Sequence, residues 1–387
     1  MQVRPARVFT PSSLATLAVC MSAVAWLVPT FGFLTKGYIV ASPWTAMSVI
    51  ALVDWYALMY LALRLGEFAG AALHRRLASR LTVPALDDPT VFLAFTVLAA
   101  VGILSTYLKI FSSMSLVEAV FFISSGMGNE LKESLYSEYS AGVVSLRYLV
   151  LYSASLAIYR IYKHRKYGPL VFTNIALLVM SALLSSRLIF VATVLSSLFL
   201  CLSDRESVRL RFGRVAIFVF LLFFVLSALN YSRNSNYYAS DNLFFWGAGA
   251  SSILTYLGSP FQVAVGAAEH ITRLAEEGAE MYRDYVDIDI TLNSNSAFVQ
   301  MHEAFGFWAW LYLTTVLFSA ATLFSYFRRY GRTALLLPCC AILYACSELW
   351  RLDLFRQGIF IVWLGMGCIV PITIGLARRI TEARAAR

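Results

Sequence analysis

The chain has 387 residues, of which 59% are hydrophobic and only 14% are charged, and its formal net charge is +9. An average soluble domain has roughly 25% charged and about 45–50% apolar residues, so this composition excludes an ordinary soluble protein and favours a polytopic membrane protein. The basic residues stand in short clusters between apolar runs, which is typical of cytoplasmic loops and argues against nucleic-acid binding.

Apolar runs that are long enough for membrane helices recur along the whole chain. A helix that crosses a bilayer needs about 20 apolar residues. The first run follows Arg4 and Arg7 and is longer than the roughly 7–15 apolar residues of a secretion signal, so we expect an uncleaved first helix. We predict ten membrane spans, at about residues 14–34, 44–63, 91–110, 141–160, 169–184, 187–202, 215–232, 305–327, 333–349 and 357–377.

The fifth and sixth predicted spans are separated only by Ser185, Ser186 and Arg187. One long helix would place Arg187 at the centre of the bilayer, which is energetically unfavourable. Two helices instead leave most of the 31 basic residues in the inner loops and both tails, as the positive-inside rule requires. We therefore predict an all-α, polytopic, single membrane domain whose two termini are cytoplasmic.

Two segments are predicted to lie on the outer face of the membrane. Residues 111–140 form a Ser-rich, acidic outer loop, and residues 233–302 form a long outer loop between the seventh and eighth spans. Within the long loop, residues 262–282 have helical periodicity, with apolar residues on one face and Glu and Arg on the other. We expect an amphipathic helix there, on the membrane surface or over a cavity.

Five arginines stand where this topology places the outer interface. A guanidinium is always charged and can hold two phosphate oxygens at once, so several converging arginines would make a diphosphate site. The alternative is that each arginine pairs with a nearby acid, as Glu348 and Asp353 would allow, or extends to the lipid headgroups. The candidates for diphosphate binding are Arg147, Arg187, Arg233, Arg351 and Arg356.

His302 and Glu303 stand at the start of the eighth span, and either side chain is a candidate general base for a sugar hydroxyl. The alternative is structural, with Glu303 neutralising an arginine and His302 at the interface. Tyr237 and Tyr256 are candidates for stacking on sugar rings, although tyrosines also form the interfacial belt of any membrane protein. For Asp54, within the second span, we expect a buried, hydrogen-bonded acid, with proton coupling as the alternative.

The sequence lacks the common motifs of nucleotide and metal chemistry. It has no Walker A motif, no GxGxxG motif after a strand and no HExxH motif. The first outer loop has no paired acids of the kind that hold a catalytic metal. The six cysteines fall inside or at the end of apolar runs without metal-ligand spacing, so we interpret them as small core residues. We expect neither a metal nor another cofactor.

Three segments of residues 170–330 carry a resemblance to a known family: LLSSRLIFVATVLSSLF, YSRNSNYY with the later YLGSPFQ, and NSNSAFVQMHEAFGFWAWLYL. They resemble the O-antigen polymerases of the Wzy type, within the wider group of oligosaccharide repeat-unit polymerases and ligases. In the ligases a His-Asn pair usually precedes the last segment, whereas this chain has Ser294-Asn295. This difference favours a polymerase, and Asn295 joins the candidate sugar-binding residues.

The resemblance implies a metal-independent, inverting glycosyltransferase that acts on the outer, periplasmic side of a bacterial inner membrane. The donor would be the growing glycan on undecaprenyl diphosphate, and the acceptor would be a hydroxyl of the incoming lipid-linked repeat unit. The arginines would stabilise the departing diphosphate, and Glu303 would remove the acceptor proton.

Three other functions stay open, one of which is a membrane acyltransferase, for which His and Arg are expected in the first helices, whereas this chain has no His before His74. An O-antigen ligase would share the same site, and a transporter or flippase for lipid-linked glycans would belong to another class, for which polar residues along the spans are expected. The partners implied are undecaprenyl diphosphate-linked oligosaccharides and membrane lipid, with a chain-length regulator protein as a further candidate and no nucleic acid.

Overall fold

The computed structural model describes most of the chain. The described residues are 2–3, 8–28, 45–77, 82–113, 115, 117–118, 142–183, 187–203, 208–209, 213, 216–217, 220–221, 223–224, 227, 245–271 and 295–385. They are almost entirely helical. The only sheet among them joins β1 (Gln2–Val3) to β2 (Val208–Arg209) in antiparallel order, with Gln2 opposite Arg209.

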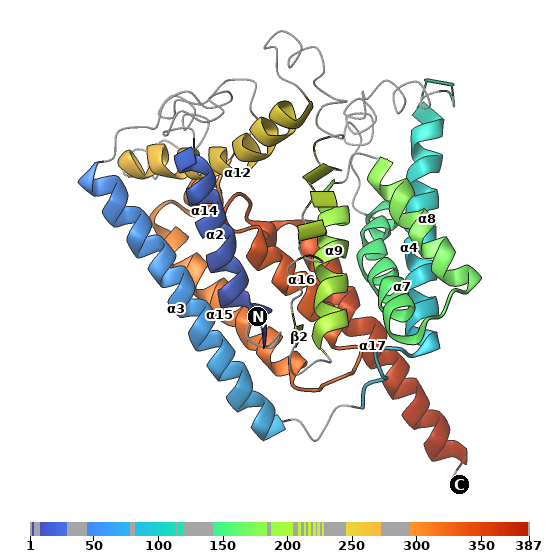
Figure 1. Cartoon of the computed structure of the whole chain (residues 1–387). Helices are drawn as coiled ribbons and strands as arrows, with labels where there is room; N and C mark the ends of the chain where they lie inside the picture. The colour runs from blue at the N-terminus through green and yellow to red at the C-terminus, as the bar shows by residue number, and fades with distance from the viewer. Residues whose placement is uncertain are drawn as a thin grey trace. The chain divides into compact units, whose positions relative to one another are not determined.

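Helices follow one another along the described chain (Figure 1). They are α2 (Pro11–Leu27), α3 (Ala46–Leu77), α4 (Pro89–Ser113), η3 (Val143–Leu149), α7 (Val150–His164), α8 (Pro169–Leu183), α9 (Arg187–Ser203), α12 (Phe245–Glu269), α14 (Ala297–Phe305), η5 (Gly306–Trp308), α15 (Ala309–Arg328), α16 (Leu336–Ser347), η6 (Leu354–Arg356) and α17 (Gly358–Ala385). The labels η mark 3₁₀ helices. The predicted runs outside residues 215–232 each overlap one of these helices.

Four helical segments of the described chain are long and apolar enough to cross a membrane: Ala46–Leu77, Pro89–Ser112, Ala297–Arg328 and Gly358–Ala385. Large apolar side chains on them, such as Phe68, Leu108 and Ile361, are exposed on the protein surface. Contiguous apolar surface of this kind is unfavourable in water and suits contact with lipid. The protein is therefore an all-α membrane protein, as its composition predicts.

The described residues divide into two compact units. Unit 1 consists of residues 1–67, 207–322 and 345–355, and unit 2 of residues 68–206, 323–344 and 356–387.

In unit 1, helix α2 is anchored at its first turn. Thr10 caps the helix by accepting a hydrogen bond from the Ser13 N–H, and Pro11 follows at a position where its missing N–H is not needed. The N–H and the hydroxyl of Ser12 both donate to Glu67 Oε1 of α3, at 3.0 and 2.8 Å. The start of α2 is thereby fixed on α3.

Helix α12 packs along α2 and contains Pro260 in its interior. A proline inside a helix cannot donate to the carbonyl four residues earlier and disturbs the bonds beside it. The Ser22 hydroxyl of α2 donates to the neighbouring carbonyl of Leu257 at 2.6 Å, and Trp26 Nε1 donates to the buried Gln262 side chain. These bonds supply polar partners to α12 in an apolar setting.

In unit 2, α4 and η3 approach each other closely. A Cβ atom built on Gly102 of α4 would lie 2.0 Å from the backbone nitrogen of Arg147 and 2.3 Å from the carbonyl carbon of Leu146. No side chain fits there, so this contact requires glycine. Trp363 Nε1 of α17 donates to the Tyr148 carbonyl, and the Tyr152 hydroxyl of α7 donates to the Trp363 carbonyl, both at 2.7 Å. Helices α4 and α17 together fix η3.

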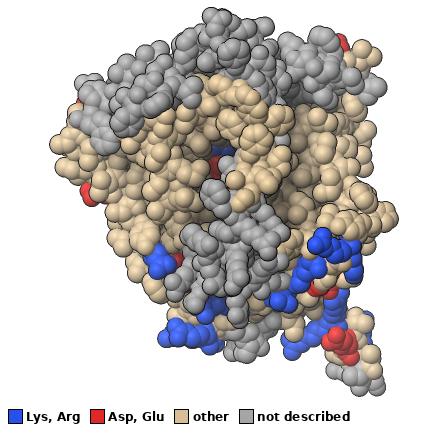
Figure 2. All heavy atoms as spheres, in the orientation of Figure 1, with Lys and Arg blue, Asp and Glu red and all other residues tan. Residues whose placement is uncertain are grey.

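One end of unit 2 gathers several basic clusters. The backbone of residues 82–88 pairs with that of residues 332–334, through the Leu86 N–H to the Arg332 carbonyl and the Ala334 N–H to the Pro84 carbonyl. Arg160 of α7 donates to the Asp87 carbonyl at 2.7 Å. Figure 2 shows basic side chains gathered over the C-terminal ends of α7 and α17.

Asp88 and Arg378 join the start of α4 to α17 at this end. Arg378 Nη2 donates to Asp88 Oδ1 at 2.9 Å, and the other two atoms of the pair, Nη1 and Oδ2, are also in contact. Burial opposes ionisation of Asp88, but the hydrogen bonds from Arg378 and the Thr90 N–H, with the charge of Arg378, hold its pKa below the usual range. The ionised pair therefore stabilises the fold.

We expect Asp88→Asn to lower the Tm of the purified protein by a few degrees at pH 7. The folded pKa of Asp88 is lower than the unfolded pKa of about 4, so its stabilisation is present above that pH and is lost as the pH falls through the folded value. Thermal unfolding in detergent between pH 7 and pH 3 should show the difference from the wild type shrinking with acid. A pH-independent difference would contradict this origin.

Part of the long predicted outer loop is helical in the structure. Residues 233–302 contain α12 and most of α14. Residues 262–269 are the first part of the predicted amphipathic helix, and in the structure they form the end of α12, which begins at Phe245. Most of these residues are small or apolar, and they are almost entirely buried. Residues 272–282, and residues 119–140 of the first predicted loop, lie outside the described residues.

Candidate functional site

Arg147 is the most unusual charged residue of unit 2. It lies in η3 and is only 7% exposed. Its Nη2 donates to the Tyr148 hydroxyl at 2.8 Å, and the guanidinium carbon lies 4.7 Å from the centre of the Tyr148 ring. Its Nη1 is buried, and no described residue accepts a hydrogen bond from it.

A buried guanidinium stays charged, and burying a charge without a counter-charge is strongly unfavourable. No described carboxylate forms an ion pair with Arg147, and the hydroxyl of Tyr148 is neutral. The fold nevertheless holds the residue firmly, since Gly102 and Trp363 fix the backbone of η3 on both sides. Arg147 is thus a positioned donor suited to an anion.

In unit 1, Arg351 forms a second charged cluster, but it has a partner. Its Nε donates to Glu348 Oε2 at 2.5 Å, three residues earlier in the chain. Its guanidinium carbon lies 5.0 Å from the ring centre of Tyr256 and 5.6 Å from that of Trp350, within range of cation–π attraction. We call Tyr256, Glu348, Trp350 and Arg351 the aromatic-charged cluster.

The aromatic-charged cluster presents one open aromatic face. Tyr256 is 48% exposed, whereas Trp350 and Glu348 are buried. The two rings are nearly perpendicular, with centres 5.7 Å apart. An exposed aromatic ring beside a charged hydrogen-bonding pair suits a sugar, because the ring covers apolar C–H groups and the charged groups bind hydroxyls.

Asp353 ties the chain after the cluster to α14 and α15. Its N–H donates to the Gln300 side-chain oxygen at 2.8 Å, and its carboxylate accepts from the Tyr312 hydroxyl at 3.1 Å. The Tyr312 ring stacks on Phe305 with centres 4.3 Å apart. These contacts join α14 and α15 to the turn that carries Arg351.

Helix α14 carries the two candidate bases, and it places them differently. Ser296 caps the helix by accepting from the Val299 N–H, and Asn295 Oδ1 accepts from the Ser296 N–H at 2.7 Å. His302 is buried, with Nδ1 bonded to the Phe298 carbonyl at 2.8 Å. Glu303, one residue later and about 100° around the helix, is half-buried.

Aromatic side chains enclose His302 on several sides. Its ring centre lies 4.4 Å from that of Phe298, 5.0 Å from Trp55 and 5.8 Å from Trp310. This surrounding is typical of a packed core residue and gives a sugar hydroxyl no approach to the ring. Of the two predicted bases, Glu303 has the more accessible position, and its role remains a prediction.

Among the described residues, the structure brings Arg351 and Tyr256 of the predicted site into contact. Arg356 is exposed at the end of η6, and Arg187 begins α9. Arg233, Tyr237 and the side chain of Arg187 lie outside the described residues. The structure also corrects one expectation, because Asp54 is exposed on α3 and not buried.

Sequence reasoning did not assign a site role to Glu348 or Trp350. The spacing of three residues between Glu348 and Arg351 predicts their ion pair, and this pairing weakens the assignment of Arg351 to diphosphate. The contact with Tyr256 joins residues far apart in the chain and has no local signal. Among the described residues, no group of three or more His, Cys, Asp or Glu side chains is arranged to hold a metal ion.

Comparison with known proteins adds no relative: no protein-family model, curated protein or solved structure matches this chain.

Proposed function

We propose that this protein is a glycosyltransferase that polymerises oligosaccharide repeat units carried on undecaprenyl diphosphate. It would act on the periplasmic side of a bacterial inner membrane, through ten spans with cytoplasmic termini. The observation that carries the proposal is the buried and rigidly held guanidinium of Arg147. Its Nη1 donates a hydrogen bond to no described residue. A diphosphate supplies the missing negative charge.

The position of Arg147 in η3, just before α7, supports this orientation. The basic end of unit 2, at Arg160 and His164, is the end that the positive-inside rule assigns to the cytoplasm. Arg147 precedes the other end of the same helix, roughly 25 Å away along the axis. Under the predicted topology, Arg147 therefore lies near the outer face, where lipid-linked glycans would be joined.

The proposed reaction is a single displacement. The acceptor hydroxyl oxygen attacks the anomeric carbon of the donor sugar, and the bond from that carbon to the diphosphate oxygen breaks. The diphosphate leaves with the bonding electron pair, and Arg147 stabilises the charge that develops on it. A general base takes the proton of the acceptor hydroxyl, the role for which the sequence offers Glu303. Attack from the side opposite the leaving group inverts the configuration.

The aromatic-charged cluster has a distinct role in this proposal. Glu348 already neutralises Arg351, so the pair is better suited to bind sugar hydroxyls than to hold a diphosphate. Tyr256 would stack on a sugar ring beside it. Asn295, close to the candidate base in the sequence, stays a candidate for further sugar contact.

The test is a gel of surface polysaccharide from a strain that lacks the gene, beside the same strain complemented with it. We expect single repeat units on the lipid anchor and no ladder in the deletion strain, with the ladder restored by complementation. Loss of all attached glycan, with long polymer accumulating on the carrier lipid, would identify a ligase. An unchanged ladder would contradict both and direct attention to transport.

A further inference from the structure

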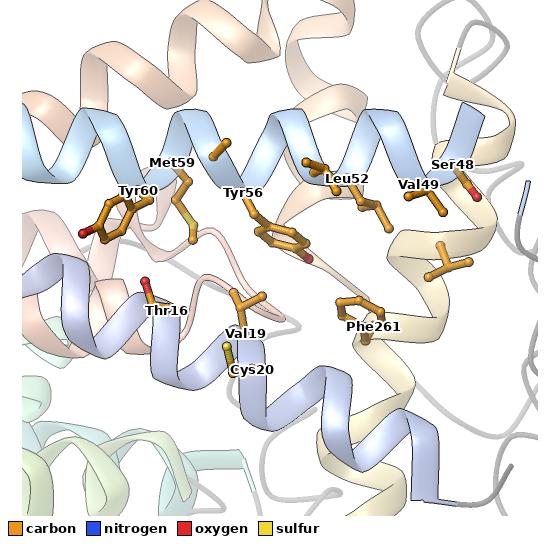
Figure 3. A pocket seen from close by; sticks show the side chains of 13 residues that line it. Thr16, Val19, Cys20, Ser48, Val49, Leu52, Tyr56, Met59, Tyr60 and Phe261 are labelled. Atoms are coloured by element: carbon orange, nitrogen blue, oxygen red, sulfur yellow. The ribbon is translucent and has the colours of Figure 1, made fainter. Parts of the chain in front are cut away.

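Unit 1 contains an apolar cavity of about 460 Å³ between α2, α3 and α12 (Figure 3). Val19 and Cys20 of α2 line one side, Leu52 and Tyr56 of α3 the other, and Phe261 of α12 closes the end between them. None of the lining residues is charged. We call it the α2–α3–α12 cavity.

The cavity is elongated along α3. Its lining residues on that helix extend from Ser48 to Tyr60, which corresponds to roughly 18 Å of helix. This length and an apolar lining fit a single extended hydrocarbon chain. A helix from a second protein, about 10 Å wide, would require a much broader groove.

The cavity opens on the surface of the protein. Two of its lining residues, Val53 and Tyr60, are 60% and 44% exposed. Both belong to a helix long and apolar enough to cross a membrane, so the surrounding medium is lipid. A hydrocarbon chain can therefore enter from the bilayer without crossing water.

The aromatic end of the cavity is held open by contacts of its own. The rings of Tyr56 and Phe261 are nearly parallel, with centres 6.3 Å apart, and Phe261 also packs on Trp26 at 5.2 Å. Trp26 is fixed by its bond to Gln262. Because these rings support one another, the space does not close by a simple side-chain rotation, and an empty cavity would lose packing contacts.

Helix α12 connects this cavity with the aromatic-charged cluster. Tyr256 of the cluster precedes Phe261 by five residues, which is roughly 7.5 Å along the axis and about 140° around the helix. A ligand with a sugar head and a long apolar tail would thus find both kinds of surface on one helix. Lipid-linked glycans have this form.

We infer that the α2–α3–α12 cavity binds the isoprenoid chain of the carrier lipid, with the attached sugars directed to the aromatic-charged cluster. This inference rests on the proposed function for the identity of the lipid. The chain would anchor one substrate while its head group reacts, so filling the cavity should weaken substrate binding more than it changes the chemical step.

Photo-crosslinking of the purified full-length protein in lipid nanodiscs tests the inference. The probe is undecaprenyl monophosphate with a diazirine in the chain, and mass spectrometry locates the labelled peptides. We expect labelling on α2, α3 and α12, reduced about tenfold by Cys20→Phe, which fills part of the cavity. Unlabelled undecaprenyl monophosphate should compete, and a dioleoyl phospholipid at the same concentration should not.

A valine-to-phenylalanine pair on α2 provides the matched control. Val19→Phe projects into the cavity, whereas Val24→Phe changes an exposed residue of the same helix that does not line it. Only Val19→Phe should reduce labelling, with Tm measured for both. If Val19→Phe unfolds, Cys20→Phe, at an exposed lining residue, still decides the question. Equal labelling of Cys20→Phe and wild type, or equal competition by the phospholipid, would overturn the inference.

Polymerisation assayed in the same nanodiscs separates this inference from the proposed function. If the wild type polymerises and Cys20→Phe does so with unchanged KM, the function stands and the cavity assignment is wrong. If the wild type shows no polymerisation but binds the probe in the cavity as described, the assignment of the cavity stands and the function is wrong.

Discussion

Replacing Arg147 with Met is expected to reduce polymer formation by at least about 100-fold, the usual effect of removing one donor that stabilises charge in a transition state. The same change should leave the Tm unchanged or raise it, because it removes a buried charge that no described carboxylate pairs with and keeps most of the side-chain volume. Both quantities are measured on purified protein with lipid-linked repeat units.

Two further variants sharpen this result. Arg147→Lys keeps the positive charge but loses the planar, two-point geometry, so it should restore little activity. Arg379→Met removes an exposed arginine of α17 and should change neither activity nor Tm. Wild-type polymer formation by Arg147→Met would exclude Arg147 from the reaction. A large fall in its Tm would instead show that the guanidinium is a structural residue.

The second large effect is expected at Gly102. In Gly102→Ala the new Cβ atom would lie 2.0 Å from the backbone nitrogen of Arg147, and a backbone cannot yield as a flexible side chain does. We expect a loss of about 3 kcal/mol or more in the free energy of unfolding, at the upper end of overpacking effects, and a matching fall in Tm. Activity should also fall, because η3 carries Arg147.

Gly365→Ala is the control for this change. Gly365 lies in the apolar helix α17, and a Cβ atom there would meet nothing within 4 Å. This variant should be neutral or slightly stabilising, since alanine favours a helix over glycine. If Gly102→Ala has the Tm of the wild type, α4 and η3 do not approach as closely as described. A fall in Tm for Gly102→Ala and none for Arg147→Met would distinguish packing from chemistry.

Much of the helical framework follows from the sequence, because membrane helices are specified by composition and length. The runs at 91–110 and 357–377 correspond to α4 and α17 within a few residues at their starts. The sequence predicts only the last part of α12, because Gly, Ser and Tyr lower the hydropathy of its first part, while its small residues allow close contact with α2.

The candidate site was less predictable from the sequence. The pairing of Glu348 with Arg351 follows from their spacing along the chain. The burial of His302 depends on contacts with Trp55 and Trp310, which lie elsewhere in the chain. No local sequence pattern therefore predicts this burial. The same holds for Arg147, whose burial depends on a glycine 45 positions earlier in the chain. Charge and residue type select candidates, whereas long-range packing decides their environments.

The proline of α12 has a consequence for how this sequence can evolve. Pro260 offers no helical donor to the Tyr256 carbonyl, four residues earlier, whereas the hydroxyl of Ser22 bonds to the next carbonyl, that of Leu257. An ordinary residue at position 260 would restore a donor to Tyr256 and would not replace the bond from Ser22. Selection on Ser22 should therefore persist in homologues that lack the proline.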